Sequence, residues 1–397
     1  MIPRILSERL ATAWKQFPVV LITGARQVGK TTLARAFLPD ASYVTLDVPA
    51  QAEAARLDPR RIFAERSPPL ILDEVQYAPG LLREIKLRVD GERAPGQFLV
   101  TGSQSFELMA GVTESLAGRA AVLTLPALSL QEIEGSKDLA AIDRVLWRGA
   151  WPELWQKPQL DRALWLGSYV ATYLERDVRN LLNVGSLRDF DRFLRACALR
   201  AAQLLSYAEL ARDVGISPNT AKSWISVLEA SQQIFLLEPY HRQRTKRLVK
   251  SPKLYFADTG LLTYLLGFNS MSDLPSHALW GAVWENLVIS EVRKHYLAHG
   301  KRPPLWFWRT AQGHELDLLI ETAPERFVVV ECKTAARIEP SVARALRPLQ
   351  AEYGERSVVQ AFIACRTEQA YPLAEGAAIE AVPLAGRGGL LGREELM

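Results

Sequence analysis

The chain has 397 residues, a formal net charge of +4, and a composition that is 48% hydrophobic and 23% charged. A chain of this length is expected to form roughly two to four domains, and its composition is that of an ordinary globular protein. So small a net charge excludes a global positive field as the means of binding nucleic acid, which leaves only local basic patches.

The spacing of the cysteines and the length of the apolar runs indicate the cellular compartment of the protein. The three cysteines are far apart, with neither a metal-binding spacing nor a disulfide framework, which favours a reducing cytosol. Residues 1–9 lack the apolar core of a signal peptide, and no uncharged apolar run approaches the roughly 18–20 residues that cross a bilayer. We therefore expect a soluble, cytoplasmic protein without a membrane partner.

The clearest motif is a glycine-rich turn between an apolar run and the start of a helical pattern, with the spacing Gly24-x-x-x-x-Gly29-Lys30-Thr31. This is the spacing of a P-loop, whose backbone N–H groups cradle phosphates. Lys30 supplies charge to the β- and γ-phosphates, and the Thr31 hydroxyl is a ligand for Mg²⁺. A turn that matches by coincidence is the alternative, which the flanking strand and helix patterns disfavour. The residues predicted to bind ATP here are Gly24, Ala25, Arg26, Gln27, Val28, Gly29, Lys30, Thr31 and Thr32.

Apolar runs recur around the P-loop, separated by helical or irregular sequence, and predict an α/β domain with a parallel sheet. One of them, residues 69–72, delivers Asp73 and Glu74 at its end. This fits a Walker B strand, in which Asp73 holds Mg²⁺ through water and Glu74 acts as a general base. The alternative is a strand that merely ends in acids. The run at residues 42–47 is expected to be the extra strand between these two, as in the additional-strand ATPases. The predicted strands are residues 17–23, 42–47, 69–72, 98–102 and 121–125.

Two further residues of this half are candidates for contact with the γ-phosphate. The strand over residues 98–102 leads to Ser103 and is similar to the sensor strand of AAA-type ATPases, although a polar turn explains it equally well. Arg119 precedes the last strand and would act in trans as an arginine finger, which requires a homo-oligomer. A surface arginine in a salt bridge is the equal alternative.

The middle of the chain is predicted to be helical. Residues 131–185 form a lid or connector. Ser206 then opens one helix with a capping box, and Ser217 caps a second helix, which makes a helix-turn-helix followed by a strand and is similar to a winged helix. The basic segment 242–253 holds six cations and no acid, so it is a candidate for DNA phosphate contact. A solvated face or a protein-binding module is the alternative.

The C-terminal part carries acids on a predicted helix and two predicted strands. The helix holds Glu285, one strand delivers Asp317, and the next ends in Glu331-Cys-Lys333, with Glu331 and Lys333 on one face. This is the constellation of the PD-(D/E)xK nuclease fold, except that a leucine precedes Asp317. Glu285, Asp317 and Glu331 would hold Mg²⁺, and Lys333 would orient or deprotonate the attacking water. A structural salt bridge between Glu331 and Lys333 is the alternative.

Taken together, the chain resembles the prokaryotic AAA-like (AAA_14) P-loop ATPases fused to a DUF4143 region, over essentially its full length. The motifs that carry the resemblance are Gly24–Thr32, Leu72–Gln76, Thr101–Ser103, Leu116–Arg119, Tyr173–Asp177, Phe256–Gly260 and Val330–Lys333. The resemblance implies an α/β multidomain fold. The expected parts are an ATPase domain (1–130), a helical connector (131–185), a winged-helix-like domain (186–275) and a restriction-endonuclease-like domain (276–397).

The expected function is that of a Mg²⁺-dependent ATPase coupled to a C-terminal half that interacts with DNA. Two alternatives stay open at this point. One is a metal-dependent nuclease in which ATP is regulatory, and the other is a P-loop signalling switch that binds protein partners and cleaves nothing.

Overall fold

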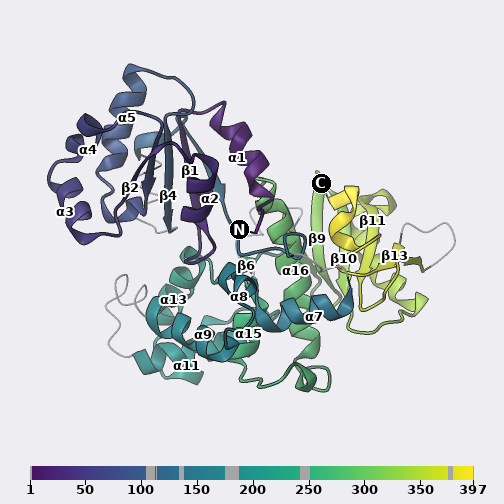
Figure 1. Ribbon diagram of the computed structural model, residues 1–397. Helices are drawn as coiled ribbons and strands as arrows, with labels where there is room; N and C mark the ends of the chain where they lie inside the picture. Colours follow the sequence, from purple (N-terminus) through teal and green to yellow (C-terminus); the bar gives the residue numbers. More distant parts are fainter. Residues whose placement is uncertain are drawn as a thin grey trace.

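The computed structural model describes residues 2–103, 112, 114–133, 138–174, 187–241, 251–373 and 379–396. It has an N-terminal α/β lobe, a helical body and a C-terminal α/β lobe (Figure 1). The two α/β lobes lie on either side of helix α16 (Trp280–Ala298), and the helical body lies below both of them in that view. Among the described residues, no helix has both the length and the apolar character needed to cross a membrane.

The N-terminal lobe is built on a five-stranded sheet in which every pair is parallel, in the order β2-β3-β4-β1-β5. All residues of β1 are buried, because helices cover both faces of the sheet, and this explains its unbroken apolar run. The strands are β1 (Val19–Gly24), β2 (Ser42–Thr45), β3 (Leu70–Asp73), β4 (Phe98–Ser103) and β5 (Ala120–Thr124).

The helices of this lobe divide between the two faces of the sheet. Residues of α1 and α2 pack with Val20 and Ile22 of β1, whereas residues of α3, α4 and α5 pack with Val19 and Leu21 on the other face. The helices are α1 (Leu6–Trp14), α2 (Lys30–Phe37), α3 (Pro49–Leu57), α4 (Pro59–Glu65) and α5 (Leu81–Gly91), with a short 3₁₀ turn η1 (Val75–Tyr77).

One detail of the sheet differs from the expectation. The strand that lies between the P-loop strand β1 and the Walker B strand β3 is β4, whereas β2, expected there from its place in the sequence, is at the edge. Strand order in a parallel sheet is set by the crossover connections, and sequence order does not reveal it.

The helical body contains the two helices that open with a serine cap. The Ser206 side chain accepts a hydrogen bond from the Glu209 N–H at 3.3 Å, and Ser217 accepts one from the Thr220 N–H at 3.0 Å. A two-stranded antiparallel hairpin follows these helices. The elements are α7 (Leu139–Arg148), α8 (Pro152–Gln156), α9 (Arg162–Tyr169), η2 (Val170–Leu174), α11 (Leu187–Ala198), α12 (Tyr207–Val214), α13 (Pro218–Ala230), β6 (Ile234–Leu237), β7 (Lys253–Phe256), α15 (Thr259–Leu265) and η3 (Met271–Asp273).

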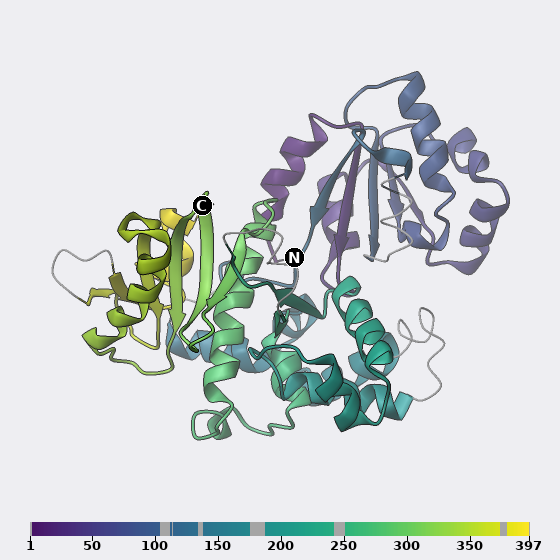
Figure 2. The same ribbon diagram turned by 180° about the vertical axis from the view of Figure 1, so that it is seen from behind.

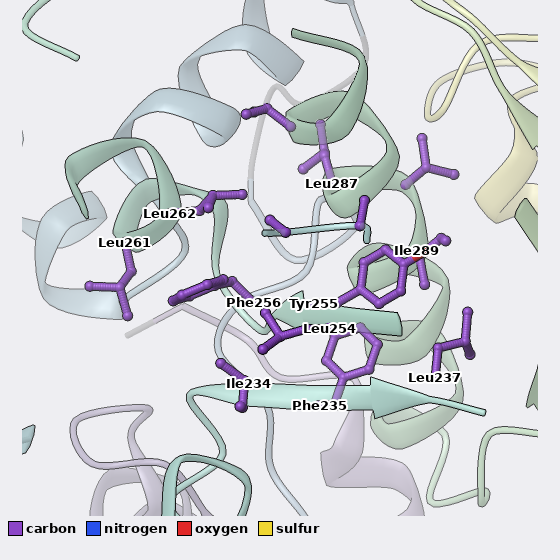
Figure 3. Packing of buried hydrophobic residues seen from close by; sticks show 14 of the residues in the cluster. Ile234, Phe235, Leu237, Leu254, Tyr255, Phe256, Leu261, Leu262, Leu287 and Ile289 are labelled. Carbon is purple, nitrogen blue, oxygen red and sulfur yellow. The ribbon is translucent and has the colours of Figure 1, made fainter. Parts of the chain in front are cut away.

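The hairpin β6–β7 connects the helical body to the C-terminal lobe. Its apolar side chains pack between α15 and α16, where Phe256 lies near Leu261 and Leu262 and the strand pair faces Leu287 (Figure 3). The chain after β6 also adds to the C-terminal sheet, because the Tyr240 N–H donates to the Phe307 carbonyl at 2.6 Å. The helical body and one face of the C-terminal sheet therefore share a single hydrophobic cluster.

The C-terminal lobe has a six-stranded mixed sheet in the order β12-β13-β11-β10-β9-β8. Helix α16 runs beside this sheet (Figure 2) and packs on the face that carries Leu318 and Val330, and α17 packs on the other face with Leu319 and Val329. The elements are β8 (Leu305–Arg309), β9 (Glu315–Ala323), β10 (Arg326–Cys332), η4 (Pro340–Leu346), α17 (Arg347–Tyr353), η5 (Glu355–Ser357), β11 (Val358–Ala364), β12 (Tyr371–Pro372), β13 (Ile379–Val382), η6 (Leu390–Gly392) and η7 (Glu394–Leu396).

Candidate functional sites

The loop between β1 and α2 has the backbone geometry that its glycines predict. Gly29 has φ 96° and caps α2, a left-handed conformation that favours glycine. A Cβ atom at Gly24 would overlap the carbonyl oxygen of Leu125, so only glycine fits beside β5. The Lys30 ammonium is buried and donates to the carbonyls of Gly24 at 3.2 Å and Ala25 at 2.9 Å. The loop is therefore closed around its own lysine.

Asp73 at the end of β3 lies against the start of α2. The Thr31 hydroxyl is 3.0 Å from both carboxylate oxygens of Asp73, and the hydroxyls of Tyr43 (2.8 Å) and Thr101 also donate to Asp73. Burial and the hydrogen bond to Asp73 raise the pKa of Tyr43 to about 12. A hydroxyl beside a carboxylate supplies the hard oxygen ligands that Mg²⁺ prefers, so these residues fit the ion.

Glu74 lies next to this pair at the edge of a cavity. Its backbone is in the left-handed region with φ 58°, and its N–H donates to the Thr101 hydroxyl at 3.3 Å. The Gln76 side-chain amide donates to the Glu74 carboxylate, and the Gln76 oxygen is buried without a hydrogen-bond partner among the described residues. The strained turn therefore holds the Glu74 carboxylate beside the P-loop.

The cavity beside the P-loop has a volume of about 320 Å³ and takes its walls from three parts of the chain. One wall is the P-loop with Glu74, the second is the N-terminal segment at Ile2 and Arg4, and the third is α8 of the helical body. The lining residues outside the predicted motifs are Ile2, Arg4, Leu33, Leu128, Pro152, Glu153 and Gln156.

Arg4 ties the N-terminal segment to the P-loop. Its guanidinium donates to the Val28 carbonyl at 2.7 Å and to the Pro126 carbonyl at 2.6 Å, and it forms an ion pair with Glu132 at 3.1 Å. The side chains of Arg4 and Glu132 are only 6% and 1% exposed. This pair therefore fixes the outer end of the loop from a distant part of the sequence.

Ser103 and Arg119, the two remaining candidates of the N-terminal lobe, lie in different places. Ser103 ends β4 and pairs with Gly24 in the strand register. Its side chain is outside the part of the protein that the structure describes. Arg119 precedes β5, at the end of the sheet opposite to the P-loop, and its Nε is 2.6 Å from Asp90. That ion pair is the arrangement expected of a surface salt bridge, and a role of Arg119 in trans stays a prediction.

The C-terminal acids lie close together on α16, β9 and β10. Glu285 accepts hydrogen bonds from the Tyr255 hydroxyl at 2.6 Å and from Lys253 Nζ at 3.0 Å, and Asp317 accepts one from the Cys332 N–H at 2.8 Å. Burial, followed by the charge of Asp317, raises the pKa of Glu285 and the pKa of Glu331 to about 7. The topology therefore brings the three predicted acids into one electrostatic cluster.

Lys333 and Glu331 form an ion pair at the end of β10. Lys333 Nζ is 3.0 Å from Glu331 Oε2, and the other carboxylate oxygen of Glu331 is buried with no hydrogen-bond partner among the described residues. Within that same described part of the chain, no set of three or more His, Cys, Asp or Glu side chains is arranged to hold a metal ion. Lys253 and Lys333 are the cations that the structure shows beside these acids, and a Mg²⁺ site at Glu285, Asp317 and Glu331 stays a prediction.

Family models match three successive parts of the chain. An AAA domain matches residues 16–134, and two domains of unknown function match residues 139–272 (DUF8612) and 280–385 (DUF4143). Uncharacterized proteins of Mycobacterium bovis and Mycobacterium tuberculosis are each 34% identical to it over 351 residues, which cover 87% of this chain and 76% of theirs. The chain belongs to the AAA–DUF4143 family.

Solved structures with a similar fold are more distant. A Walker-type ATPase of Pyrococcus abyssi is 18% identical, with a TM-score of 0.42, and the match covers 66% of this chain and 94% of that one. The AMPPCP-bound DnaA of Aquifex aeolicus is 15% identical, with a TM-score of 0.30, and covers 57% of this chain and 86% of that one.

The family match confirms a P-loop ATPase domain fused to a DUF4143 region, and the parallel sheet confirms the α/β fold of the N-terminal lobe. The winged helix and the nuclease-like fold stay predictions. Two sequence motifs fall wholly or partly outside the described residues: 242–250 of the basic segment, and 175–177 of the family motif that starts at Tyr173. Lys253, counted among the basic segment's cations, is 4% exposed at its side chain and paired with acids, so it is not a surface contact for phosphates.

Proposed function

We propose that this AAA–DUF4143 protein binds Mg²⁺·ATP at the P-loop, hydrolyses it, and passes the nucleotide state to its C-terminal half. The observation that carries the proposal is the contact between Thr31 and Asp73 at one wall of a cavity that also holds Lys30 and Glu74. Lys30 and Thr31 come from the start of α2, Asp73 ends β3, and Glu74 directly follows it.

Each side chain has a separate role in this proposal. Lys30 leaves the carbonyls of Gly24 and Ala25 and pairs with the phosphates, while the loop N–H groups donate to phosphate oxygens. Thr31 and Asp73 hold the Mg²⁺, which neutralises charge on the transferred phosphoryl group. Glu74 accepts a proton from the attacking water, and Gln76 orients the Glu74 carboxylate.

The nucleotide state reaches the C-terminal half through the loop before α8. This helix forms a wall of the cavity, and the Ala150 N–H just before it donates to the Asp258 carboxylate at 2.7 Å. A Cβ atom at Gly260 would overlap the backbone of Gly149, and a Cβ atom at Gly149 would overlap the Asp258 carboxylate, so the loop before α8 packs directly against the start of α15 (Thr259–Leu265). Asp258 lies two residues after the end of β7, so a shift of the cavity wall moves the hairpin.

A DNA-handling role of the C-terminal half is a second candidate. It is favoured by the exposed face of α13, where Asn219 and Lys222 are exposed while Ala221, Trp224 and Ile225 are buried. A second helix after a capped turn, followed by a hairpin, is the arrangement that places a helix in a DNA groove. Binding to duplex DNA that weakens steeply with salt supports this role, and binding that is absent at low salt argues for the protein-binding switch.

The nucleotide assignment is tested by measuring the equilibrium binding of a fluorescent ATP analogue with and without Mg²⁺. Mg²⁺ is expected to tighten binding to the wild-type protein, and Asp73→Asn is expected to abolish that gain while weak binding without Mg²⁺ persists. If Mg²⁺ tightens binding of the analogue to Asp73→Asn as much as it does to the wild type, Asp73 does not hold the ion.

A further inference from the structure

The ammonium of Lys253 lies inside the acidic cluster of the C-terminal lobe. Its side chain is 4% exposed, and Nζ is 3.0 Å from Glu285 Oε1 and 2.6 Å from Glu315 Oε1. Lys253 begins β7, Glu285 comes from α16 and Glu315 begins β9. One buried cation therefore joins the hairpin, the long helix and the sheet.

The protein's own donors already occupy one oxygen of each of three carboxylates in the cluster. Besides Lys253, the Tyr255 hydroxyl donates to Glu285 Oε1 at 2.6 Å. The Cys332 N–H donates to Asp317 Oδ2, and Lys333 Nζ donates to Glu331 Oε2. A metal ion that takes these oxygens as ligands would have to displace the donors.

The net charge of the acidic cluster depends on whether Lys253 is present. Two carboxylates, those of Glu285 and Glu315, lie within ion-pair distance of the Lys253 ammonium, and an opposite charge at this distance favours the charged form. When all groups are ionised, four carboxylates face three cations, which leaves one excess negative charge. Without Lys253 the excess is two, which matches a divalent ion. The groups are Glu285, Glu315, Asp317 and Glu331, with Lys253, Lys333 and Arg309.

We propose that Lys253 is the resident cation of this acidic cluster, and that a divalent metal ion binds the cluster only when the charge of Lys253 is removed. Glu331 Oε1, buried and without a hydrogen-bond partner among the described residues, is the oxygen that such an ion would engage. The cluster is therefore closed to metal while the Lys253 ammonium occupies it. This inference does not depend on ATP binding at the P-loop.

The test measures Mn²⁺ binding to the full-length protein, by the loss of the free-ion electron paramagnetic resonance signal. Asp73→Asn is present in every sample, so that the P-loop lobe does not contribute a metal site, and no nucleotide is added. We expect no saturable site with Lys253 present, and one site that binds about tenfold tighter or more in Lys253→Met, because a positive charge within ion-pair distance is gone. Lys253→Arg is the matched control and should behave like the parent.

Equal Mn²⁺ affinity in the parent and in Lys253→Met would overturn the proposal. A second measurement does not require Lys253→Met to fold. Mn²⁺ should leave the melting temperature of the Asp73→Asn parent unchanged, and a stabilisation that disappears on the further change Asp317→Asn would show that the metal already binds beside Lys253.

Discussion

The Thr31 hydroxyl lies 3.0 Å from both carboxylate oxygens of Asp73, although 42 positions separate the two residues. The parallel sheet produces this contact, because β1 and β3 end at the same edge and both pair with β4 between them. A hydroxyl and a carboxylate that meet at a helix start are suited to a divalent ion and a phosphate together.

Glu74→Gln is expected to keep nucleotide binding and to lower kcat by about 10²–10⁴-fold, because the general base is lost. Steady-state ATP hydrolysis and binding of a fluorescent ATP analogue measure the two effects. Glu8→Gln, on the exposed face of α1, is the control and should leave both unchanged. A Glu74→Gln protein with wild-type kcat would assign proton transfer to another group.

Arg4→Ala should destabilise the protein by about 3–5 kcal/mol, because it leaves the buried Glu132 carboxylate without its cation. It should also weaken ATP binding, since the Val28 carbonyl of the P-loop loses its donor. Urea unfolding measures the first effect. The control is Arg61→Ala, whose exposed i,i+4 pair with Glu65 contributes little to stability; equal losses in the two variants would contradict the role of Arg4.

Asp258→Asn is expected to uncouple the cavity from the hairpin. The carboxylate accepts from the Ala150 N–H at 2.7 Å and from the Leu261 N–H at 2.9 Å, and an amide offers a single acceptor oxygen for them, at a cost of about 1–3 kcal/mol. A non-hydrolysable ATP analogue should change amide hydrogen exchange over residues 253–256 in the wild type and not in Asp258→Asn. Asp273→Asn, in the 3₁₀ turn η3, is the control. The same exchange response in both variants would place the coupling elsewhere.

Stability should fall as pH rises from about 4.5 to about 7 through Glu229, whose pKa is raised from 4.5 to about 7 by burial and by the charge of Glu238. The folded state binds more protons than the unfolded state in this window, so each step up in pH favours unfolding. Glu229→Gln should flatten the slope, by on the order of 1–3 kcal/mol across the window. Urea unfolding at several pH values measures it, and parallel curves for the two proteins would contradict the shift.

The features that the sequence alone predicted are local ones. The P-loop glycines, the acids at the end of β3 and the serine caps of α12 and α13 are set by neighbours within a few positions, so spacing and residue type were enough. The buried stripe of α13, at Ala221, Trp224, Ile225 and Leu228, followed from helical periodicity in the same way.

The features that the sequence did not reveal depend on contacts between distant segments. Arg4 and Pro152 line the cavity beside the P-loop from outside the motif, and nothing in their immediate sequence neighbours marks them. Tyr43 contacts Asp73 only because β2 and β3 are adjacent. In the sequence Lys253 is one cation of the basic segment 242–253. The tertiary fold places it among acids, so the charge pattern predicted the wrong environment for its side chain.

The central claim, that the P-loop binds and hydrolyses Mg²⁺·ATP, is tested most directly by steady-state ATP hydrolysis of the purified Lys30→Ala protein. Its control is Lys86→Ala on α5, because Lys86 is not among the residues that line the cavity. The proposal predicts that Lys30→Ala lowers kcat by about 10²-fold or more, because a preorganised charge on the phosphates is removed, and that Lys86→Ala matches the wild type. Wild-type turnover in a folded Lys30→Ala protein would contradict it.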